Sequence, residues 1–308
     1  MEEFMIATGV GGNGKSTING LMMKCVGQYG YEIPSVALTK EIKDGPNPES
    51  AKLDNVRFAL MSEPDAKKRF CCSTIKALTG NDTLPVRLQY SNNVGIDLLF
   101  TGVCEGNDIP DFDEVNQAMN RRVRATIFEA VAIEKEDFDK LDEEDKKHYT
   151  IKNPYYKTND FKDKYKQALF MILKNYFQEF IKNGKTLKSM PPKCKSKVKS
   201  LFATSDNIYS WFEEIYEGVD LAESEAIKLK DVYANFSSST NFMKLPKQDQ
   251  RKFNYKHFTE KISTNLFLQK SLKLRGTYWK KDRQTADYLI GWKLKSLDKD
   301  DDKLDVEN

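Results

Sequence analysis

The stretch that decides the fold is residues 9–17, which read GVGGNGKST. It fits the phosphate-loop pattern G-x-x-x-x-G-K-[ST] at every fixed position. In such a loop, glycines let backbone N–H groups converge on phosphate oxygens, the lysine reaches the β- and γ-phosphates, and the hydroxyl after it binds Mg²⁺. Lys15 and Ser16 fill these two roles. The expected nucleotide-binding residues are Gly9, Gly11, Gly12, Asn13, Gly14, Lys15, Ser16 and Thr17.

The residues on both sides of the loop agree with this interpretation. Residues 4–7, FMIA, form a short apolar run typical of the strand that precedes a phosphate loop. Residues 17–24 have helical spacing, so the anion would lie at a helix N-terminus. A chance match in a glycine-rich turn is the alternative, and the context disfavours it. The sequence therefore predicts an α/β domain with a parallel sheet that binds ATP with Mg²⁺.

A second candidate group follows an apolar run at residues 56–61, which predicts a buried strand. Glu63 lies at the carboxyl end of that strand, where parallel α/β sheets bind their ligands. Its carboxylate would share the Mg²⁺ with Ser16 and orient the attacking water. The alternative is a surface acid that ends a strand. Asp65 is a weaker candidate because Pro64 interrupts the acidic pair.

Three further segments follow in the first half. Residues 73–90 predict a short helix, a turn and a strand that leads into a hairpin, and residues 96–101 predict another buried strand. A polar segment with Asn107 comes next, and Arg121 and Arg122 precede a short strand. Taken alone, Lys76 and Arg87 are typical of solvated side chains, and the two arginines of a surface ion-pair network.

The order of these motifs resembles that of superfamily 3 helicases. The phosphate loop, the strand with Glu63, IKALTGND, NDIPDF and NRR followed by IF are most similar to the ATPase part of poxvirus, giant-virus and phage primase–helicase proteins. The resemblance covers about residues 1–132. It implies an AAA+-like domain that works as a ring, usually a hexamer, with ATP held between neighbouring subunits.

The resemblance also implies roles for individual residues. Asn107 matches the polar sensor of the γ-phosphate, and Arg122 matches the arginine finger offered to the neighbour's nucleotide, with Arg121 as the competing choice. Lys76 and Arg87 fall in the segment that lies along the DNA channel in this superfamily.

One position departs from the family pattern. Many members of the superfamily carry two adjacent acids at the second motif, whereas here Ser62 precedes Glu63. It stays open whether Glu63 serves both the metal and the water, or whether Asp65 assists it.

The second half predicts a helical region followed by a second small domain. Residues 134–147 are a mixed charge run, typical of a solvated helix or linker, and residues 161–181 have the spacing of an amphipathic helix buried on one face. The lysine-rich residues 185–199 would be either a solvated surface or a track for a phosphate backbone.

Residues 226–297 predict a helix, a loop, a helix and a hairpin, which resembles a winged helix. Its basic wing would bind nucleic acid, although a winged helix used only for protein contacts is the alternative. The expected domains are 1–135 for the ATPase, 136–220 for the linker and helical region, 221–297 for the winged-helix-like domain and 298–308 for an acidic tail. The expected nucleic-acid contacts in this half are Lys273, Arg275, Lys280 and Lys281.

Composition limits the remaining classes. The chain has 308 residues, 31% of them charged and 39% hydrophobic, and a formal charge of +3 that is too small to establish a polyanionic partner. Five cysteines without C-x-x-C spacing are typical of reduced thiols. Without a membrane-length apolar run or a signal peptide, we expect an intracellular protein of a virus-infected host, in the cytoplasm or the nucleus. The early start of the first strand predicts that an upstream primase or collar portion is missing.

The leading hypothesis is an ATP-dependent DNA helicase, the motor portion of a viral-type replicative primase–helicase that moves on single-stranded DNA. A phosphate-loop kinase of a nucleoside or small molecule is one alternative, and it would need an arginine-bearing lid in cis. A non-catalytic, ATP-holding nucleic-acid-binding module is another. DNA versus RNA, translocation polarity, ring size and nucleotide preference stay open.

Overall fold

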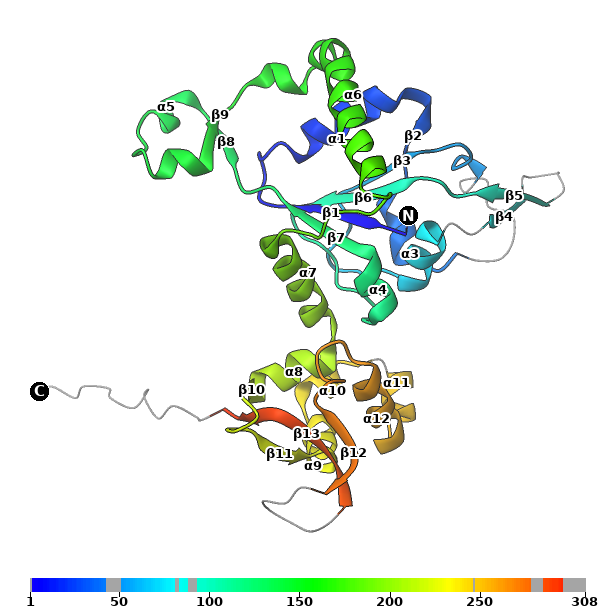
Figure 1. The fold of residues 1–308 in the computed structure, drawn as a ribbon, viewed down its shortest axis with the longest axis vertical. Helices are drawn as coiled ribbons and strands as arrows, with labels where there is room; N and C mark the ends of the chain where they lie inside the picture. Colours follow the sequence, from blue (N-terminus) through cyan, green and yellow to red (C-terminus); the bar gives the residue numbers. More distant parts are fainter. Residues whose placement is uncertain are drawn as a thin grey trace, which may run out of the picture. The chain divides into compact units, whose positions relative to one another are not determined.

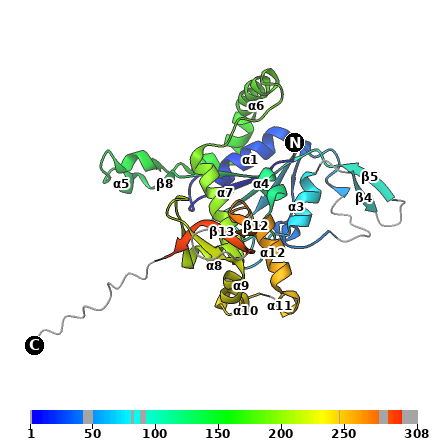
Figure 2. The ribbon, with the colours of Figure 1, turned by 60° about the horizontal axis from the view of Figure 1, so that its bottom comes forward.

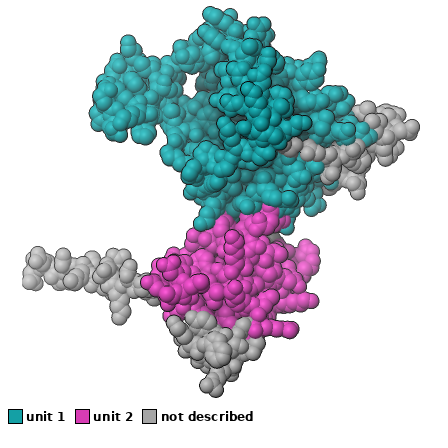
Figure 3. All heavy atoms as spheres, in the orientation of Figure 1, with its two compact units in different colours: residues 1–114, 118–202 teal, residues 115–117, 203–308 magenta. Residues whose placement is uncertain are grey.

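The computed structural model describes residues 2–42, 51–80, 83–87, 93–245, 247–277 and 285–295. The chain divides into two compact units (Figure 3). The first unit comprises residues 1–114 and 118–202, and the second comprises residues 115–117 and 203–308. Each unit has a hydrophobic core of its own.

The first unit is built on a five-stranded parallel sheet (Figure 1). From edge to edge its strands are β2 (Gly30–Glu32), β3 (Phe58–Ser62), β6 (Thr101–Gly106), β1 (Phe4–Thr8) and β7 (Val123–Ile127). All neighbouring pairs are parallel, so the carboxyl ends of all five strands meet at one edge. β6 lies between β1 and β3. The expected α/β fold with a parallel sheet is thereby confirmed.

Both faces of the sheet are covered, which explains why β1 and β3 have apolar side chains at nearly every position. On one face, Ala7, Leu60 and Val103 pack with Met22 and Met23 of α1 (Lys15–Val26).

On the other face, aromatic rings form a continuous series. Phe4 of β1 contacts Phe70, Phe70 contacts Phe112, and Phe112 contacts Phe202 of α7 (Pro192–Ser205). Two short helices, α3 (Cys72–Thr79) and α4 (Gln117–Arg122), bury Ile75 and Met119. On this face, residues from distant parts of the chain therefore pack against β1.

The antiparallel hairpin of β4 (Thr83–Arg87) and β5 (Asn93–Asp97) projects away from the sheet in both ribbon views (Figures 1 and 2). The buried strand expected at residues 96–101 is wrong in position, because β5 ends at Asp97 and the sheet strand starts at Thr101. Ile96, Leu98 and Phe100 are buried, so the alternating pattern correctly indicates buried side chains. They lie at the end of β5 and in the segment that connects it to β6.

Two short 3₁₀ helices flank the edge strand β2. η1 (Gly27–Tyr29) precedes it, and η2 (Ser35–Thr39) follows it. Leu38 is the buried residue of η2. Its side chain reaches the core without any strand pairing.

The segment after β7 leaves the sheet and returns to α1. β8 (Val131–Ile133) and β9 (Tyr149–Ile151) form a parallel ribbon, and the charge run between them folds into α5 (Lys135–Phe138) and η3 (Asp145–His148). After η4 (Pro154–Lys157) comes α6 (Asn159–Lys182), which lies along α1, with Asp163 Oδ2 3.6 Å from Lys24 Nζ.

The helix expected at residues 161–181 forms, but its burial was wrong. None of the residues of α6, all of which the structure describes, is buried. Both α1 and η4 contact it, whereas Phe170, Tyr176 and Phe177 stay exposed, Tyr176 by 66%. None of the described helices is long and apolar enough to cross a membrane.

The second unit has the element order of a winged helix. Its long strand β13 (Thr285–Leu294) pairs antiparallel with the other three strands, and Trp211, Phe212, Phe236 and Phe258 lie in its core. α8 therefore groups with the unit that begins at Ala203, upstream of residue 221, where the sequence places the boundary. The remaining elements are α8 (Asn207–Ile215), β10 (Tyr216–Gly218), β11 (Glu225–Lys228), α9 (Leu229–Ser237), α10 (Thr240–Met243), α11 (Lys247–Lys252), α12 (Tyr255–Thr264) and β12 (Leu272–Thr277).

Candidate active site

The loop between β1 and α1 is held open by its glycines and one asparagine. Gly9 has a φ of 148°, and a Cβ there would overlap the carbonyl oxygen of Phe128, at the end of β7. Asn13 Nδ2 donates to the same oxygen at 3.0 Å. Gly14 has a φ of 87°, and α1 starts after it without a side-chain cap. The N–H of Lys15, the first residue of α1, has only a long hydrogen bond to Asn13 Oδ1, at 3.5 Å, which a phosphate oxygen at this helix N-terminus would replace.

Lys15 is buried at the centre of this loop, with 4% of its surface exposed. Its Nζ donates to the carbonyl oxygen of Gly9 at 2.8 Å, to Asn13 Oδ1 at 3.0 Å and to Asn107 Oδ1 at 2.8 Å. Burial lowers the pKa of Lys15, while the charges of Glu63 and Glu105 act in the opposite direction. The ammonium is held by neutral acceptors, so phosphate oxygens would be stronger partners for it.

Glu63 follows β3 with a backbone conformation that non-glycine residues rarely adopt. Its φ is 47°, in the left-handed region, and its N–H donates to the carbonyl oxygen of Glu105 at 2.8 Å. Such strain is often found at functional sites. Asp65, by contrast, accepts from the backbone N–H of Lys67 at 3.1 Å and lies 3.9 Å from Lys68 Nζ. Its carboxylate is thus engaged in its own turn.

Asn107 lies where β6 ends, between the phosphate loop and Glu63. Thr8 Oγ1 donates to its carbonyl oxygen at 3.4 Å, and its side chain binds Lys15. Because β6 is inserted between β1 and β3, the fold brings Lys15, Asn107 and Glu63 to one edge of the sheet. All three line the same cavity of about 450 Å³.

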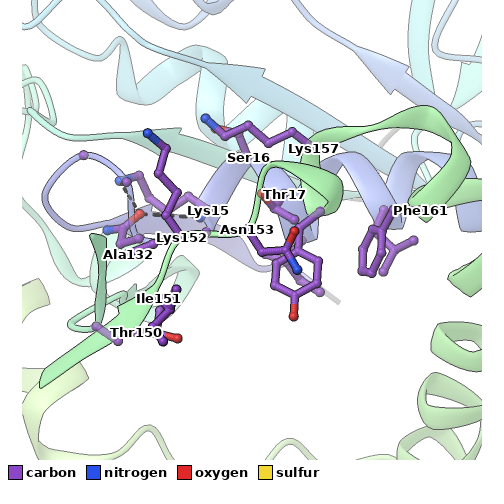
Figure 4. A pocket seen from close by; sticks show the side chains of 18 of the residues that line it. Lys15, Ser16, Thr17, Ala132, Thr150, Ile151, Lys152, Asn153, Lys157 and Phe161 are labelled. Atoms are coloured by element: carbon purple, nitrogen blue, oxygen red, sulfur yellow. Dashed lines mark hydrogen bonds between the residues drawn. The ribbon is translucent and has the colours of Figure 1, made fainter. Parts of the chain in front are cut away.

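The outer wall of this cavity comes from a part of the chain that the motifs do not mark (Figure 4). Lys152, at the end of the β8–β9 ribbon, binds Glu134 Oε1 at 2.6 Å, and its N–H donates to the carbonyl oxygen of Ile133. This wall was missed because no local spacing relates it to the phosphate loop. Its residues are Ala130, Ala132, Thr150, Ile151, Lys152, Asn153, Tyr156, Lys157 and Phe161.

Glu105 is a second residue that the sequence interpretation did not single out. It lies on β6 with 4% of its surface exposed, and it accepts a hydrogen bond from Asn19 Nδ2 at 2.6 Å. Burial, together with the charges of Glu105 and Glu63, raises the pKa of the neighbouring Cys104 to about 12. An acid within a strand carries no motif of its own, and only the sheet register shows its place.

The two candidate finger arginines end α4, and they differ in exposure. Arg122 is 9% exposed, its Nη2 lies 2.7 Å from Glu2 Oε2, and its Nη1 donates to the carbonyl oxygen of Ala118. In the described part of the chain, its Nε is a buried nitrogen without a hydrogen-bond partner. Arg121 is exposed. No arginine is among the described residues that line the cavity.

The candidate nucleic-acid contacts lie in both units. Lys76 on α3 forms an ion pair with Glu114 Oε2 at 2.8 Å. Arg87 ends β4, opposite Asn93, but its side chain is outside the described set.

In the second unit, Lys273 and Arg275 are exposed on β12, and the N–H of Arg275 donates to Asp287 Oδ1 at 2.9 Å. Lys280 and Lys281, like the acidic tail at 298–308, lie outside the described residues.

The residues present fit the phosphates of a nucleotide and Mg²⁺. The glycine cradle, the uncapped start of α1 and the buried Lys15 ammonium provide for phosphate oxygens. Ser16 and Glu63 offer the hard oxygen ligands that Mg²⁺ prefers, and both line the cavity. The described residues hold no group of three or more His, Cys, Asp or Glu that would cage a metal by themselves. Mg²⁺ usually binds through one or two protein ligands plus phosphates and waters.

Comparison with known proteins points in one direction. No protein-family model matches the chain. "Putative helicase 022R" of Frog virus 3 (isolate Goorha) is 32% identical over 132 residues, which is 41% of this chain and 14% of that protein. "Putative helicase L207/L206" of Acanthamoeba polyphaga mimivirus is 25% identical over 189 residues, 59% of this chain and 19% of that protein. These relatives are viral proteins named as helicases.

The expected resemblance to viral helicases is thereby confirmed. "Putative helicase V13" of Sputnik virophage is 25% identical over 229 residues, 70% of this chain and 28% of that protein. The chain therefore spans well under a third of the length of each of these relatives. The apo C-terminal region of NrS-1 (305–718) is similar in structure over 94% of this chain and 67% of that chain, with 12% identity and a TM-score of 0.45, which is too low to inform the site.

Proposed function

We propose that this chain is the motor portion of a superfamily 3 helicase, which hydrolyses Mg·ATP between the subunits of a hexameric ring to move along single-stranded DNA. The observation that carries the proposal is the convergence of Lys15, Asn107 and Glu63 on one cavity, with Lys15 Nζ 2.8 Å from Asn107 Oδ1. The viral relatives named as helicases support it, and they support action inside an infected host cell.

Each side chain has a task that follows from its position. Lys15 exchanges its neutral acceptors for the β- and γ-phosphates, and Ser16 holds the Mg²⁺, which neutralises developing charge when it is bound. Glu63 orients the attacking water, and Asn107 contacts the γ-phosphate. The nucleoside lies against the apolar side of Ile151, Tyr156 and Phe161 in the outer wall.

The site is completed from a neighbouring subunit. Phosphoryl transfer gains about 10³–10⁵-fold from an arginine that stabilises the transition state. The described cavity residues include no arginine, so the fold leaves this charge to be supplied from outside. Of the two candidates, the exposed Arg121 is the one that a neighbour's nucleotide could reach without breaking an ion pair.

The nucleic acid is contacted by two elements. The β4–β5 hairpin follows α3, so a shift of this hairpin between ATP and ADP states would carry Arg87 along a strand. The motion requires that the two nucleotide states bind the strand unequally. In the winged-helix unit, Lys273 and Arg275 on β12 provide positive charge for a phosphate backbone.

The first experiment measures phosphate release from ATP by wild type, Lys15→Ala and Lys24→Ala. Both substitutions remove a lysine from α1, but Lys24 is exposed and pairs with Asp163, away from the phosphate loop. We expect Lys15→Ala to abolish hydrolysis and Lys24→Ala to keep it.

Equal activity of wild type and Lys15→Ala would contradict the assignment of the site. Transfer of the γ-phosphate to a nucleoside or small acceptor, rather than to water, would favour the kinase alternative.

A further inference from the structure

Glu105 is a buried carboxylate to which the motifs assign no task. One of its carboxylate oxygens accepts from Asn19 Nδ2 at 2.6 Å, and the other accepts from Ser62 Oγ at 3.3 Å. Both donors are neutral. An ionised carboxylate that is removed from water is costly unless a positive charge compensates it. The charge of Lys15 interacts with Glu105 and supplies part of this compensation, and a bound Mg²⁺ would add to it.

The sheet register places Glu105 at the middle of the nucleotide edge. It is the parallel partner of Ala7 on β1 and of Ser62 on β3. Residues in register point to the same face of a sheet. That face is the one covered by α1, because Asn19 of α1 donates to Glu105. The first turn of the same helix carries Lys15 and Ser16, the residues expected to meet the phosphates and Mg²⁺.

The two carboxylates near the phosphate loop differ in a way that separates their tasks. Glu63 is exposed and lines the cavity, where a water can reach it. Glu105 is not among the described residues that line the cavity, and 4% of its surface is exposed. Lys15 is bound by carbonyl and amide oxygens, and its charge interacts with both acids. Glu63 is thus placed to act on water, and Glu105 to act through its charge.

Resting on the proposed function, we propose that Glu105 is the second carboxylate of the site, a positioning residue whose buried negative charge favours Mg²⁺ beside Ser16. Mg·ATP hydrolysis divides the work between an acid on the metal side and a group that orients water. Ser62, directly before Glu63, is uncharged and donates to Glu105. The charge on the metal side thus comes from the neighbouring strand, about 4.8 Å away.

The test measures the affinity for a fluorescent ATP analogue with Mg²⁺ and with EDTA, in wild type and in Glu105→Gln. Glutamine keeps the shape of the side chain and an oxygen for Ser62. We expect the Kd with Mg²⁺ to rise at least tenfold. The Kd with EDTA should stay the same or fall, because one negative charge near the phosphates is gone. Thermal melting of the nucleotide-free variant should be unchanged or shifted upward, because a desolvated charge is removed.

A second variant makes the test independent of a folding defect. Ser62→Asp in the Glu105→Gln background returns a carboxylate to the same face of the sheet, one strand away, and it should restore the preference for Mg²⁺. Glu32→Gln serves as the matched control, because Glu32 is an exposed acid on the edge strand β2 of the same sheet and is not among the described cavity residues; it should leave both Kd values unchanged.

An unchanged ratio of the two Kd values in Glu105→Gln would overturn the inference. An equal loss of affinity with and without Mg²⁺, together with a lower melting temperature, would also overturn it, because it would assign Glu105 a structural role. Wild type that binds the ATP analogue in neither condition would overturn the proposed function itself, and the two failures are thereby distinguishable.

Discussion

At the residue scale, the two arginines that end α4 are adjacent in sequence but differ in environment. Arg122 is held by Glu2 and by the carbonyl oxygen of Ala118, whereas Arg121 is exposed. An arginine that completes the site of a neighbouring subunit must extend away from its own subunit. An exposed guanidinium can do so without losing contacts within its own subunit. The structure therefore favours Arg121 for the role that the sequence first assigned to Arg122.

Arg121→Ala is expected to affect turnover, and Arg122→Ala to affect the stability of the fold. Arg121→Ala should keep Mg·ATP binding and lower turnover about 10³-fold or more, because transition-state charge is no longer stabilised. Arg122→Ala should lower the free energy of unfolding by about 1–3 kcal/mol, because a buried, ion-paired group is removed. Equilibrium nucleotide binding, turnover and denaturant unfolding of both variants check this. Loss of nucleotide binding in Arg121→Ala would contradict the trans role.

The sequence identified the site residues that belong to local motifs. Lys15, Ser16, Glu63 and Asn107 each follow or interrupt a recognisable pattern, and the fold brings them to one cavity. Glu105 could not be found in this way, because its importance comes from its register with Ser62. The outer wall, residues 150–161, also depends on how β9 returns to the loop, which no spacing encodes.

At the element scale, two candidate DNA contacts, one on α3 and one on the β4–β5 hairpin, differ in their surroundings. Lys76 precedes the hairpin on α3 and is already paired with Glu114, whereas Arg87 lies at the far end of β4. We expect Arg87→Ala to weaken binding of single-stranded DNA and to flatten its logarithmic salt dependence by about 0.7. Lys76→Ala should have a smaller effect, because Glu114 offsets its charge.

Fluorescence anisotropy of a labelled oligonucleotide at several salt concentrations measures both quantities. Equal salt slopes for wild type and Arg87→Ala would show that Arg87 makes no phosphate contact.

In the second unit, the carboxylate of Asp287 links the β12–β13 hairpin to α12. Asp287 on β13 accepts from Tyr255 Oη at 2.8 Å and from the N–H of Arg275 at 2.9 Å. Burial, together with the hydrogen bond to Asp287, raises the pKa of Tyr255 to about 12. An unfolded tyrosine has a pKa of about 10. The stability that this shift contributes is therefore complete below pH about 10 and is lost as the pH rises to about 12.

Tyr255→Phe is expected to lower stability at neutral pH by about 1 kcal/mol, because a hydrogen bond is lost. Its stability should then fall less steeply than that of wild type between pH about 10 and about 12. Denaturant midpoints across this pH range give the comparison. Parallel curves for the two proteins would refute a link between Tyr255 ionisation and folding.

The elements that the sequence predicted best are those with long or uninterrupted patterns. β1, α1 and the β12–β13 hairpin fall close to where the sequence pattern placed them. The predicted strand at residues 96–101 begins upstream of β6, because the sequence of β6, TGVCEG, contains two glycines and an acid. The apolar run before it has buried side chains but is not part of the parallel sheet. α6 was expected to be buried because helical spacing shows which face is apolar but not whether anything covers it.

At the scale of the whole molecule, the chain combines an α/β unit and a second unit of helices and antiparallel strands, each with its own core. The nucleotide cavity lies entirely within the first unit, and its described lining contains lysines but no arginine. We therefore expect a single subunit to bind the nucleotide by itself and to need a neighbour for fast turnover. Activity should therefore depend on assembly.

The most direct measurement is ATP turnover per subunit against protein concentration, with and without single-stranded DNA, using Lys15→Ala as the blank. We predict that turnover per subunit rises steeply with concentration and that single-stranded DNA stimulates it, because the site is shared and is coupled to the strand. A constant turnover per subunit that DNA leaves unchanged would show a site complete within one chain, and it would contradict the account.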